Sequence, residues 1–578
     1  MRTEKSGQDG QGGEGGPGGC GGPAEGTRGD GTAGPPHPRQ GHPGPHRGGG
    51  ASHPRQGGRR GGGAGRHRHR RARPGRRGFT AGAVGVLLAV LCAGLAAAWD
   101  SPRGGTEGPE AVPGGGDARA SAATALPFDM PDRAALRAGG RMVFAHYFTP
   151  YPLSLDNEEP HRDYYARNYL APHGENGKHR AYGGLLRDRP LPVRPQDGDW
   201  EAANLRQEVR TARDAGLDGF TLDVLSLAGR NWERCRMLLE AAHAVDPGFR
   251  IVLMPDMASL TTEGPREIAD ALAELARSPA AHRLPDGRLV VSPFKAEARS
   301  AAWWSGVLDD LRARHGLRTA FVPVFLDFDA SHEEFAPISH GFSDWGVRTH
   351  TPPEDPGRQA RAAHRLGKIW MQPVAVQDAR PNQGVYDEAG NTGTLRATWE
   401  RAIAGGADWV QLTTWNDYSE TTHIAPSQHN GHAYLDLTSY YLTRFKTGRW
   451  PAIVRDTLYL TARPHPADAR PTGGQTRLMT LRGSSEPARD TVEALAFLTR
   501  PATLDITSGA VTTSRPVPAG TTPVVVPLRT GRVSAAAVRD GRTAAAVELP
   551  FRVLRHPEVQ DLQYRAATSG RPAPPCCL

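Results

Sequence analysis

The chain has 578 residues and a formal net charge of +9 at pH 7. This length allows more than one domain, since a typical domain takes roughly 100–200 residues. The positive charge lies at the start, because residues 1–77 hold 15 Lys and Arg against 5 Asp and Glu. Nucleic-acid binding is therefore not expected of the folded part. Of the cysteines, Cys235 alone lies in patterned sequence, as a helix residue, so a disulfide framework and a zinc motif are excluded.

Residues 1–77 are rich in Gly, Pro, Arg and His and almost free of apolar side chains. Such a segment cannot offset the entropy cost of ordering, so we expect a disordered basic tail. The apolar residues that follow, 78–99, carry no charge and reach the roughly 20 residues that cross a bilayer as a helix. Either an uncleaved transmembrane anchor or an export signal, cut near residues 96–98, fits this pattern.

The location of the remaining chain follows from the residues around this apolar segment. Arg76 and Arg77 precede it, and the positive-inside rule keeps such residues in the cytoplasm. Everything after Trp99 is therefore expected to be extracytoplasmic, either secreted or held to the membrane through residues 79–98. Residues 100–138, rich in Gly, Ala and Pro, are predicted to form a linker.

From residue 139 to 450, short β-rich runs alternate with stretches of helical period. Alternating strands and helices predict parallel βα units, and eight such units over about 300 residues predict a (β/α)8 TIM-type barrel. The predicted strands are 142–148, 219–225, 249–257, 288–294, 319–328, 340–347, 368–376 and 408–417. Helices are predicted within 200–216, 231–244, 264–278, 302–316 and 394–406.

Polar and aromatic residues gather where these strands end, which is the edge that carries the chemistry in TIM barrels. Flat rings there can stack on the apolar face of a sugar. Each acid also has a structural alternative, since Asp223 or Asp256 could cap a helix or pair with an Arg. His146 could likewise be a core histidine. The candidates for substrate contact are His146, Tyr147, Asp223, Asp256, Trp345, Trp415, Asn416, Tyr418 and His423.

The residue types at these strand ends favour glycoside hydrolysis. No Gly-rich phosphate loop, "GxSxG" elbow or "HExxH" helix appears in the sequence, and no metal or cofactor is predicted. Glycoside hydrolysis needs two carboxyl groups, and Asp417 and Glu420 lie three residues apart just past the eighth strand. A helical turn would separate their Cβ atoms by about 5–6 Å and an extended loop by roughly 10 Å, so both stereochemical outcomes stay open. Alternatively, Asp417 caps a loop and Glu420 is solvated.

Several motifs resemble glycoside hydrolase family 71, the endo-1,3-α-glucanases or mutanases, over about residues 140–448. They are "VFAHYF", "AGLDGFTLDV", "PDM", "VVSPF" and, most specifically, "TWNDYSETTHIAP". The resemblance implies a polysaccharide substrate, an inverting reaction and Asp417 and Glu420 as the catalytic pair. We assign Glu420 as acid and Asp417 as base, with the reverse assignment left open.

The resemblance also affects two other acids. It adds Asp218, in "DGF", as a lower-ranked catalytic candidate. On geometry alone Asp218 is structural, because it lies at the entrance of its strand, five residues before Asp223. Fungal relatives tend to have "NDWGE" where this chain has "NDYSE", and Asn at Asp223. A bacterial-type member is therefore expected.

Residues 451–566 are predicted to form an accessory β-sandwich, and residues 567–578 a disordered end. The predicted strands are 456–463, 492–499, 502–509, 522–528, 533–539 and 544–551. Because no Trp follows Trp450, a structural partner for the barrel is favoured over a carbohydrate-binding module. Two alternatives to a monomeric α-1,3-glucanase remain: a hydrolase of another α-glucan or α-mannan, and an inactive cell-surface glycan-binding protein.

Overall fold

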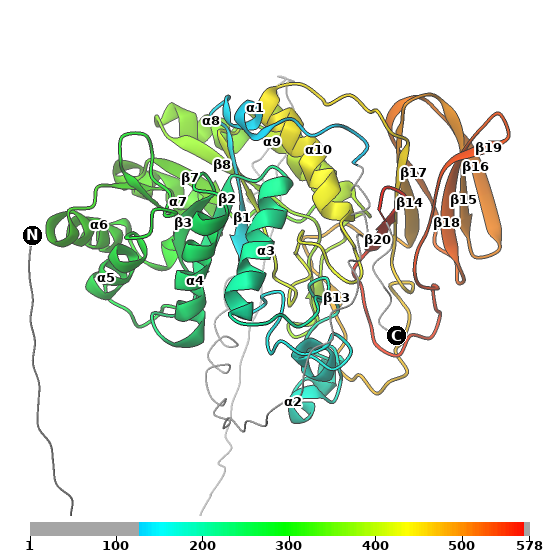
Figure 1. Ribbon diagram of the computed structural model, residues 1–578, viewed down its shortest axis with the longest axis horizontal. Helices are drawn as coiled ribbons and strands as arrows, with labels where there is room; N and C mark the ends of the chain where they lie inside the picture. The colour runs from blue at the N-terminus through cyan, green and yellow to red at the C-terminus, as the bar shows by residue number, and fades with distance from the viewer. Residues whose placement is uncertain (1–125, 572–578) are drawn as a thin grey trace, which may run out of the picture. The chain divides into compact units, whose positions relative to one another are not determined.

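A parallel, TIM-like sheet forms the first part of the computed structural model, which describes residues 126–571 (Figure 1). The strand order is β5-β4-β3-β2-β1-β11-β8-β7-β6, and every neighbouring pair in it is parallel. The strands are β1 (Met142–Tyr147), β2 (Gly219–Val224), β3 (Arg250–Pro255), β4 (Leu289–Val291), β5 (Thr319–Phe321), β6 (Val324–Phe325), β7 (Gly341–Asp344), β8 (Ile369–Val374) and β11 (Trp409–Leu412). All eight predicted strand segments are confirmed, the fifth of them divided into β5 and β6.

The two ends of this strand order belong to one stretch of chain. Only Val322 and Pro323 separate β5 from β6. On one side of the stretch, the Val322 backbone N–H donates to the Val291 carbonyl at 2.9 Å. On the other side, the Pro323 carbonyl accepts from the Ser343 backbone N–H, also at 2.9 Å. The stretch therefore pairs with β4 and with β7.

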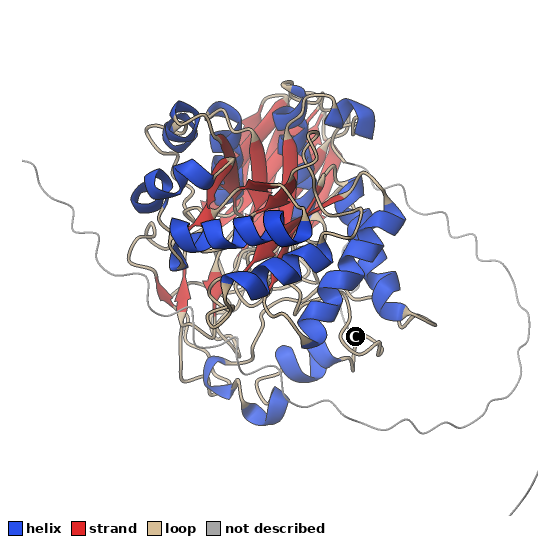
Figure 2. Ribbon diagram, turned by 90° about the vertical axis from the view of Figure 1, so that its left-hand side faces the viewer, coloured by secondary structure: helices blue, strands red, loops and turns tan. Residues whose placement is uncertain are grey.

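A long helix follows each strand position and packs outside the sheet (Figure 2). These helices are α3 (Trp200–Asp214), α4 (Gly229–Val245), α5 (Pro265–Leu275), α6 (Ala301–His315), α7 (Phe328–Phe335), α8 (Arg358–Arg365), α9 (Gly393–Ala404) and α10 (Ala433–Thr447). Side-chain N-caps begin α3, α6 and α7. Ser300, for example, accepts a hydrogen bond from the Trp303 backbone N–H at the start of α6, and Gly316 ends that helix in the left-handed conformation.

Side chains alternate between the two faces of the strands, as the period of two requires. Phe144, Val252 and Met254 belong to the apolar cluster inside the sheet. Val143 and Leu222 belong to the larger cluster between the strands and the helices. Both faces are therefore buried, as expected of a parallel sheet covered by helices.

The predicted linker, 100–138, needs correction at its C-terminal end. Residues 126–138 include helix α1 (Arg133–Arg137), and Leu136 is buried against the barrel core. Phe128 is also buried, and it forms a β-bridge with Ile453. This short segment supplies apolar anchors that cover the end of the barrel. The rest of the predicted linker, the basic tail and the apolar segment 78–99 lie outside the described residues.

Two four-stranded antiparallel sheets follow the barrel, with the orders β17-β14-β12-β20 and β16-β15-β18-β19. Their strands are β12 (Thr457–Ala462), β14 (Thr491–Leu498), β15 (Ala502–Ser508), β16 (Val511–Val517), β17 (Gly520–Pro527), β18 (Val533–Arg539), β19 (Arg542–Glu548) and β20 (Arg565–Thr568). The six predicted strands are present. The prediction missed β16, where polar residues hide the apolar alternation, and β20, which extends into the end that was expected to be disordered.

The first of these sheets packs on helix α10, as Figure 1 shows. The Phe497 ring on β14 meets the Tyr440 ring edge-on, with centroids 4.9 Å apart. Tyr459 and Leu495 join the same apolar cluster as the barrel helices. The antiparallel sheets are therefore packed as a structural partner of the barrel.

Short elements occupy the loops. The connection from β1 to α3 holds η1 (Tyr165–Tyr169), α2 (Gly174–Gly177) and η2 (Arg180–Tyr182), and η3 (Ala296–Ala298) and η4 (Ala336–Ile338) lie in later loops. A small third sheet joins β9 (Ala379–Arg380), β10 (Val385–Tyr386) and β13 (Thr480–Leu481). Within residues 126–571, no helix has both the length and the apolar character needed to cross a bilayer.

Because β2 and β3 approach each other closely at Gly219, a substitution at this position is expected to lower the stability of the fold. A Cβ atom at Gly219 would lie 1.7 Å from the Arg250 carbonyl oxygen, so Gly219→Ala forces the two strands apart. We expect a loss of about 1–3 kcal/mol in the free energy of unfolding, measured by chemical denaturation. Gly306→Ala in α6 is the control, because its Cβ would meet only Pro265 at an ordinary 3.5 Å. Equal stability of the two variants would contradict the predicted close approach.

Candidate active site

The turn after β11 carries both predicted catalytic carboxyl groups. Asp417 Oδ1 accepts hydrogen bonds from the Ser419 backbone N–H at 2.9 Å, from the Ser419 hydroxyl at 2.6 Å and from the Glu420 backbone N–H at 3.2 Å. The Thr422 backbone N–H donates back to the Asp417 carbonyl at 3.2 Å. The loop is therefore turned rather than extended, and Asp417 does cap it.

Glu420 is not solvated, contrary to the alternative considered from the sequence. Its side chain is 13% exposed, and its Oε1 accepts a hydrogen bond from Arg380 Nη1 at 2.6 Å. Arg380 in turn donates to both oxygens of Asp378, from Nε at 2.6 Å and from Nη2 at 2.5 Å. Because Asp378 holds two of its nitrogens, Arg380 presents the third to Glu420 in a fixed direction.

Burial shifts the pKa of both carboxyl groups upwards. The pKa of Glu420 rises to about 8, because burial disfavours its charged form more than Arg380 favours it, and the nearby Asp417 adds to the rise. The pKa of Asp417 also rises through burial, although its hydrogen bonds with Ser419 and the charge of Arg380 oppose the shift. At neutral pH Glu420 therefore holds a proton.

Two further acids, Asp223 and Asp256, lie where β2 and β3 end. Asp223 Oδ2 is 3.4 Å from His146 Nε2, while Asp223 Oδ1 is buried with no hydrogen-bond partner. Burial and the charge of Asp417 hold the pKa of Asp223 well above its usual range. Asp256 caps its own turn through the Ala258 backbone N–H and the Ser259 hydroxyl, and burial and Asp223 raise its pKa to about 7.

His146 and Trp345 lie beside these acids. Burial lowers the pKa of His146 to about 4, so the ring is neutral, and its Nδ1 lies 3.2 Å from the sulfur of Met254. The Trp345 ring meets the His146 ring edge-on at 5.0 Å and the Phe294 ring at 4.6 Å, and it is partly exposed. Of the predicted aromatic contacts, Trp345 therefore keeps a surface that a sugar could reach.

Tyr147 and Trp415 do not point toward these carboxyl groups, which corrects their prediction as substrate contacts. The Tyr147 hydroxyl donates to Glu208 Oε1 at 3.1 Å, and the Trp415 indole N–H donates to Glu208 Oε2 at 3.0 Å. Glu208 lies on α3, so both rings are buried between strands and helices. Burial raises the pKa of Glu208 to about 7. No role of Glu208 could be predicted from the sequence, because a single Glu in a helical segment is normally expected on the protein surface.

Three other predicted contacts brace loops instead. Asn416 accepts from the Phe148 backbone N–H at 2.7 Å and donates to the Phe148 and Tyr151 carbonyls. His423 Nε2 lies 3.1 Å from Asp188 Oδ2, and its ring stacks near that of Tyr418 at 4.2 Å. All three predicted residues are buried. They tie the turn after β11 to the long loop after β1, which fixes Asp417 and Glu420 indirectly.

Comparison with known proteins gives the family of the chain. The chain matches the model of glycosyl hydrolase family 71 over residues 195–553, more than half of its length. It belongs to this family. The matched region includes the turn with Asp417 and Glu420 and continues into the antiparallel sheets. This family 71 chain is therefore a glycoside hydrolase.

The alignments with two relatives cover most of the length of each relative. The chain is 24% identical over 383 residues to the glucan endo-1,3-alpha-glucosidase agn1 of Schizosaccharomyces pombe, covering 60% of this chain and 86% of the relative. It is 25% identical over 372 residues to the mutanase Pc12g07500 of Penicillium rubens, covering 60% and 80%. Both relatives are fungal, so the expectation of a bacterial-type member is not supported.

A solved structure resembles the chain weakly. The GH99 endo-alpha-mannosidase of Bacteroides thetaiotaomicron is 15% identical, with a TM-score of 0.42, and covers 53% of this chain and 98% of its own. A likeness at this level carries no argument about the substrate of the family 71 chain.

Asp218 lies away from the other acids, which corrects its prediction as a catalytic residue. It precedes β2, at the opposite end of that strand from Asp223. Its Oδ2 accepts from the Val143 backbone N–H at 2.8 Å and pairs with Lys446 on α10, whose side chain is fully buried. Asp218 therefore joins β1, β2 and α10 at the N-terminal end of the parallel strands, as the geometric argument from the sequence predicted.

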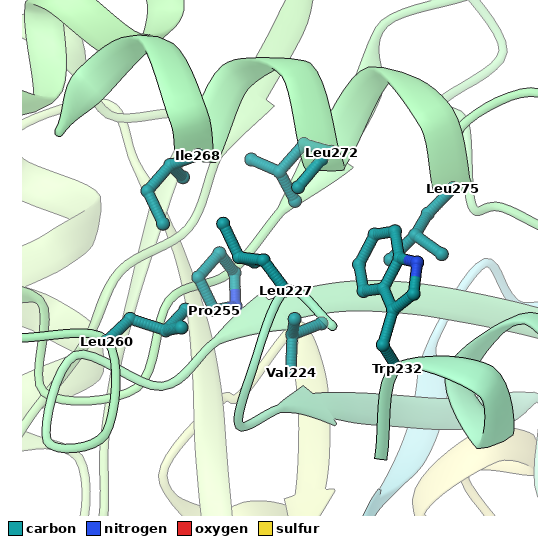
Figure 3. Close-up of a pocket in the computed structure, with 9 residues that line it drawn as sticks. Val224, Leu227, Trp232, Pro255, Leu260, Ile268, Leu272 and Leu275 are labelled. Atoms are coloured by element: carbon teal, nitrogen blue, oxygen red, sulfur yellow. The ribbon is translucent and has the colours of Figure 1, made fainter. Parts of the chain in front are cut away.

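An apolar pocket lies on the outer side of the strand ends that carry Asp223 and Asp256 (Figure 3). Val224 and Pro255, the last residues of β2 and β3, face Leu272 on α5 and Trp232 on α4. All of the residues that line this pocket are apolar, so it offers no hydrogen bond to a sugar. Among the described residues, no group of three or more His, Cys, Asp or Glu is placed to hold a metal ion.

The placement of Asp218 predicts that Asp218→Asn affects stability rather than chemistry. The substitution leaves Lys446 buried without a countercharge, a change that costs about 3–5 kcal/mol. We expect a lower melting temperature and an unchanged kcat per folded molecule. Asp214→Asn, at a position that is 66% exposed, serves as the control with little effect on either quantity. A kcat at least tenfold lower in fully folded Asp218→Asn would restore the catalytic interpretation.

Proposed function

We propose that this family 71 enzyme cleaves α-1,3-glucan internally with inversion, using Glu420 as general acid and Asp417 as general base. The observation that carries the proposal is the buried turn in which the two groups have different partners. Glu420 is held by a cation, whereas Asp417 is held by neutral donors. The names of the two fungal relatives, a glucan endo-1,3-alpha-glucosidase and a mutanase, support this substrate.

The two groups divide the proton transfers. Glu420 is protonated at neutral pH, and it donates its proton to the glycosidic oxygen as the bond from that oxygen to C1 breaks. The three hydrogen bonds on Asp417 Oδ1 stabilise the carboxylate form. Its other oxygen takes the proton of the water that attacks C1 from the opposite face. A second general acid–base cycle is not needed, because inversion is complete in one displacement.

The neighbouring residues orient the sugar. Asp223 lies beside His146 at the strand ends, and its buried Oδ1 has no hydrogen-bond partner among the described residues, so it keeps a polar atom for the sugar. Trp345 supplies a ring for stacking. Within residues 126–571, no feature favours the alternative of an inactive binding protein, since that role would not require a protonated acid beside a hydrogen-bonded carboxylate.

We also propose the finer architecture and the location of this enzyme. The stretch that joins β5 and β6 pairs with strands on both of its sides, which supports a closed (β/α)8 barrel. The apolar residues 78–99 support secretion or anchoring at the membrane, with the site outside the cytoplasm. Expression in intact cells followed by protease treatment would test the location, since a cytoplasmic barrel would be protected.

We expect the removal of either carboxyl group to cause a near-complete loss of activity. Asp417→Asn and Glu420→Gln each remove one proton transfer, and we expect kcat to fall by about 10²–10⁴-fold. The measurement is the release of reducing ends from α-1,3-glucan, with circular dichroism to confirm folding. Asp309→Asn, at an exposed position on α6, is the matched acid control. Near-normal activity of either folded turn variant would refute the assignment of that residue.

The raised pKa of Glu420 predicts the alkaline limb of the pH profile. The acid must be protonated to act, so kcat/KM should fall as the pH rises through about 8. The base must be ionised, so the acidic limb should lie above the ordinary pKa of an aspartate. Initial rates between pH 4 and pH 10, with enzyme stability checked at each pH, give both limbs. A plateau that extends well beyond pH 9 would exclude Glu420 as the acid.

A further inference from the structure

The small sheet β9-β10-β13 joins the active site to a part of the chain beyond the barrel. β9 contains Arg380, which contacts Glu420, and β9 pairs with β10 in an antiparallel manner. β10 pairs in parallel with β13, which lies after the first strand of the antiparallel sheets. The backbone that carries Arg380 is thus held, through one intermediate strand, by residues 480–481.

The opposite side of β9 contacts the catalytic turn directly. The Ala379 backbone N–H lies 2.9 Å from the Glu420 carbonyl and 2.9 Å from the Thr421 hydroxyl oxygen. The Thr421 hydroxyl also lies 3.1 Å from the Ala379 carbonyl. β9 therefore lies between the turn that carries the acid and the strands that lead to β13, so a displacement of β13 would move both Arg380 and the turn.

Side-chain hydrogen bonds also connect the segment after β13 to the surroundings of Arg380. Arg482, directly after β13, donates from Nε to Asp387 at 3.0 Å and from Nη2 to Asp378 Oδ1 at 3.5 Å. Asp378 is the residue that fixes Arg380, and it is almost fully buried. The Arg482 backbone N–H additionally donates to the Tyr386 carbonyl at 2.8 Å. Arg482 therefore shares with Arg380 the carboxylate that aims Arg380 at the acid.

We infer that Arg482, from beyond the barrel, is a positioning residue for the reaction, because it acts through Asp378 and Arg380 to hold Glu420 in its donating orientation. The chain after the barrel is therefore part of the active-site structure as well as a packing partner. This inference rests on the proposed role of Glu420. It does not require Arg482 to touch the sugar.

The test is a set of full-length variants assayed on soluble α-1,3-linked glucan oligosaccharides. In Arg482→Met the carboxylates lose one neighbouring cation, and Asp378, which sets the direction of Arg380, loses one of the groups that hold it. We expect kcat to fall by about 10- to 100-fold with KM changed little, since a small misplacement of a catalytic group has this effect. The alkaline limb should move to higher pH, because the less compensated carboxylates favour the protonated form of Glu420.

Two companion variants separate positioning from general damage. Arg482→Lys keeps the charge but lacks the planar guanidinium that reaches Asp387 and Asp378 from separate nitrogens, so it should return the alkaline limb toward its original pH while kcat stays low. Arg470→Met, at an exposed position on the same segment, should leave kcat and the limb unchanged. Activity of Arg482→Met that falls only in proportion to the folded fraction, with the limb unmoved, would overturn the inference.

Glu420→Gln measures the proposed function independently. If Glu420→Gln is inactive while Arg482→Met keeps wild-type kcat and pH profile, the inference fails and the proposed function stands. If Glu420→Gln stays active, the proposed acid is wrong and the inference fails with it. Loss of kcat in both variants, with the shifted limb in Arg482→Met, supports both.

Discussion

The contact between Arg380 and Glu420 is the interaction on which the candidate active site depends. A buried carboxyl group beside Asp417 would have no preferred direction without a partner, and burial alone would make it protonated but mobile. Arg380 supplies the direction because Asp378 binds two of its nitrogens and leaves one for Glu420. The pKa of Glu420 nevertheless stays high, since burial outweighs the cation. Glu420 can therefore be fixed in direction by Arg380 and still carry a proton at neutral pH.

The residues around this contact show why a crowded polar segment was needed after β11. Asn416 and His423 do not face the sugar but attach the turn to neighbouring loops. Trp415 attaches it to α3 through Glu208. Each of these side chains is buried with hydrogen-bond partners, and such networks restrict a loop to one arrangement. Much of the polarity in this segment thus holds the two carboxyl groups in place.

The sequence predicted the strands well, because hydrophobic periodicity carries that information, and it placed Asp417 and Glu420 together just past the end of a strand. It predicted individual contacts less well. Tyr147 follows His146, and the period of two sends neighbouring side chains to opposite faces, so both could not line the site. Past the end of a strand this rule stops, and the directions of Trp415 and Tyr418 depend on contacts with distant loops. Arg380 and Glu208 were missed because the contacts of Arg380 with Glu420 and of Glu208 with Tyr147 and Trp415 join residues far apart in the sequence.

The charges around Glu420 explain why a segment that follows the parallel sheet contributes to the candidate site. Three arginines and four carboxyl groups lie in contact or close to one another: Arg348, Arg380, Arg482, Asp378, Asp387, Asp417 and Glu420. If every group were ionised, this cluster would carry one net negative charge in a buried setting, and a proton on Glu420 removes it. Losing the cation of Arg482 would leave a net negative charge even with that proton bound. Without Arg482 the buried cluster would therefore keep one uncompensated negative charge. Both the added segment and the proton on Glu420 are needed to bring the net charge of the cluster to zero.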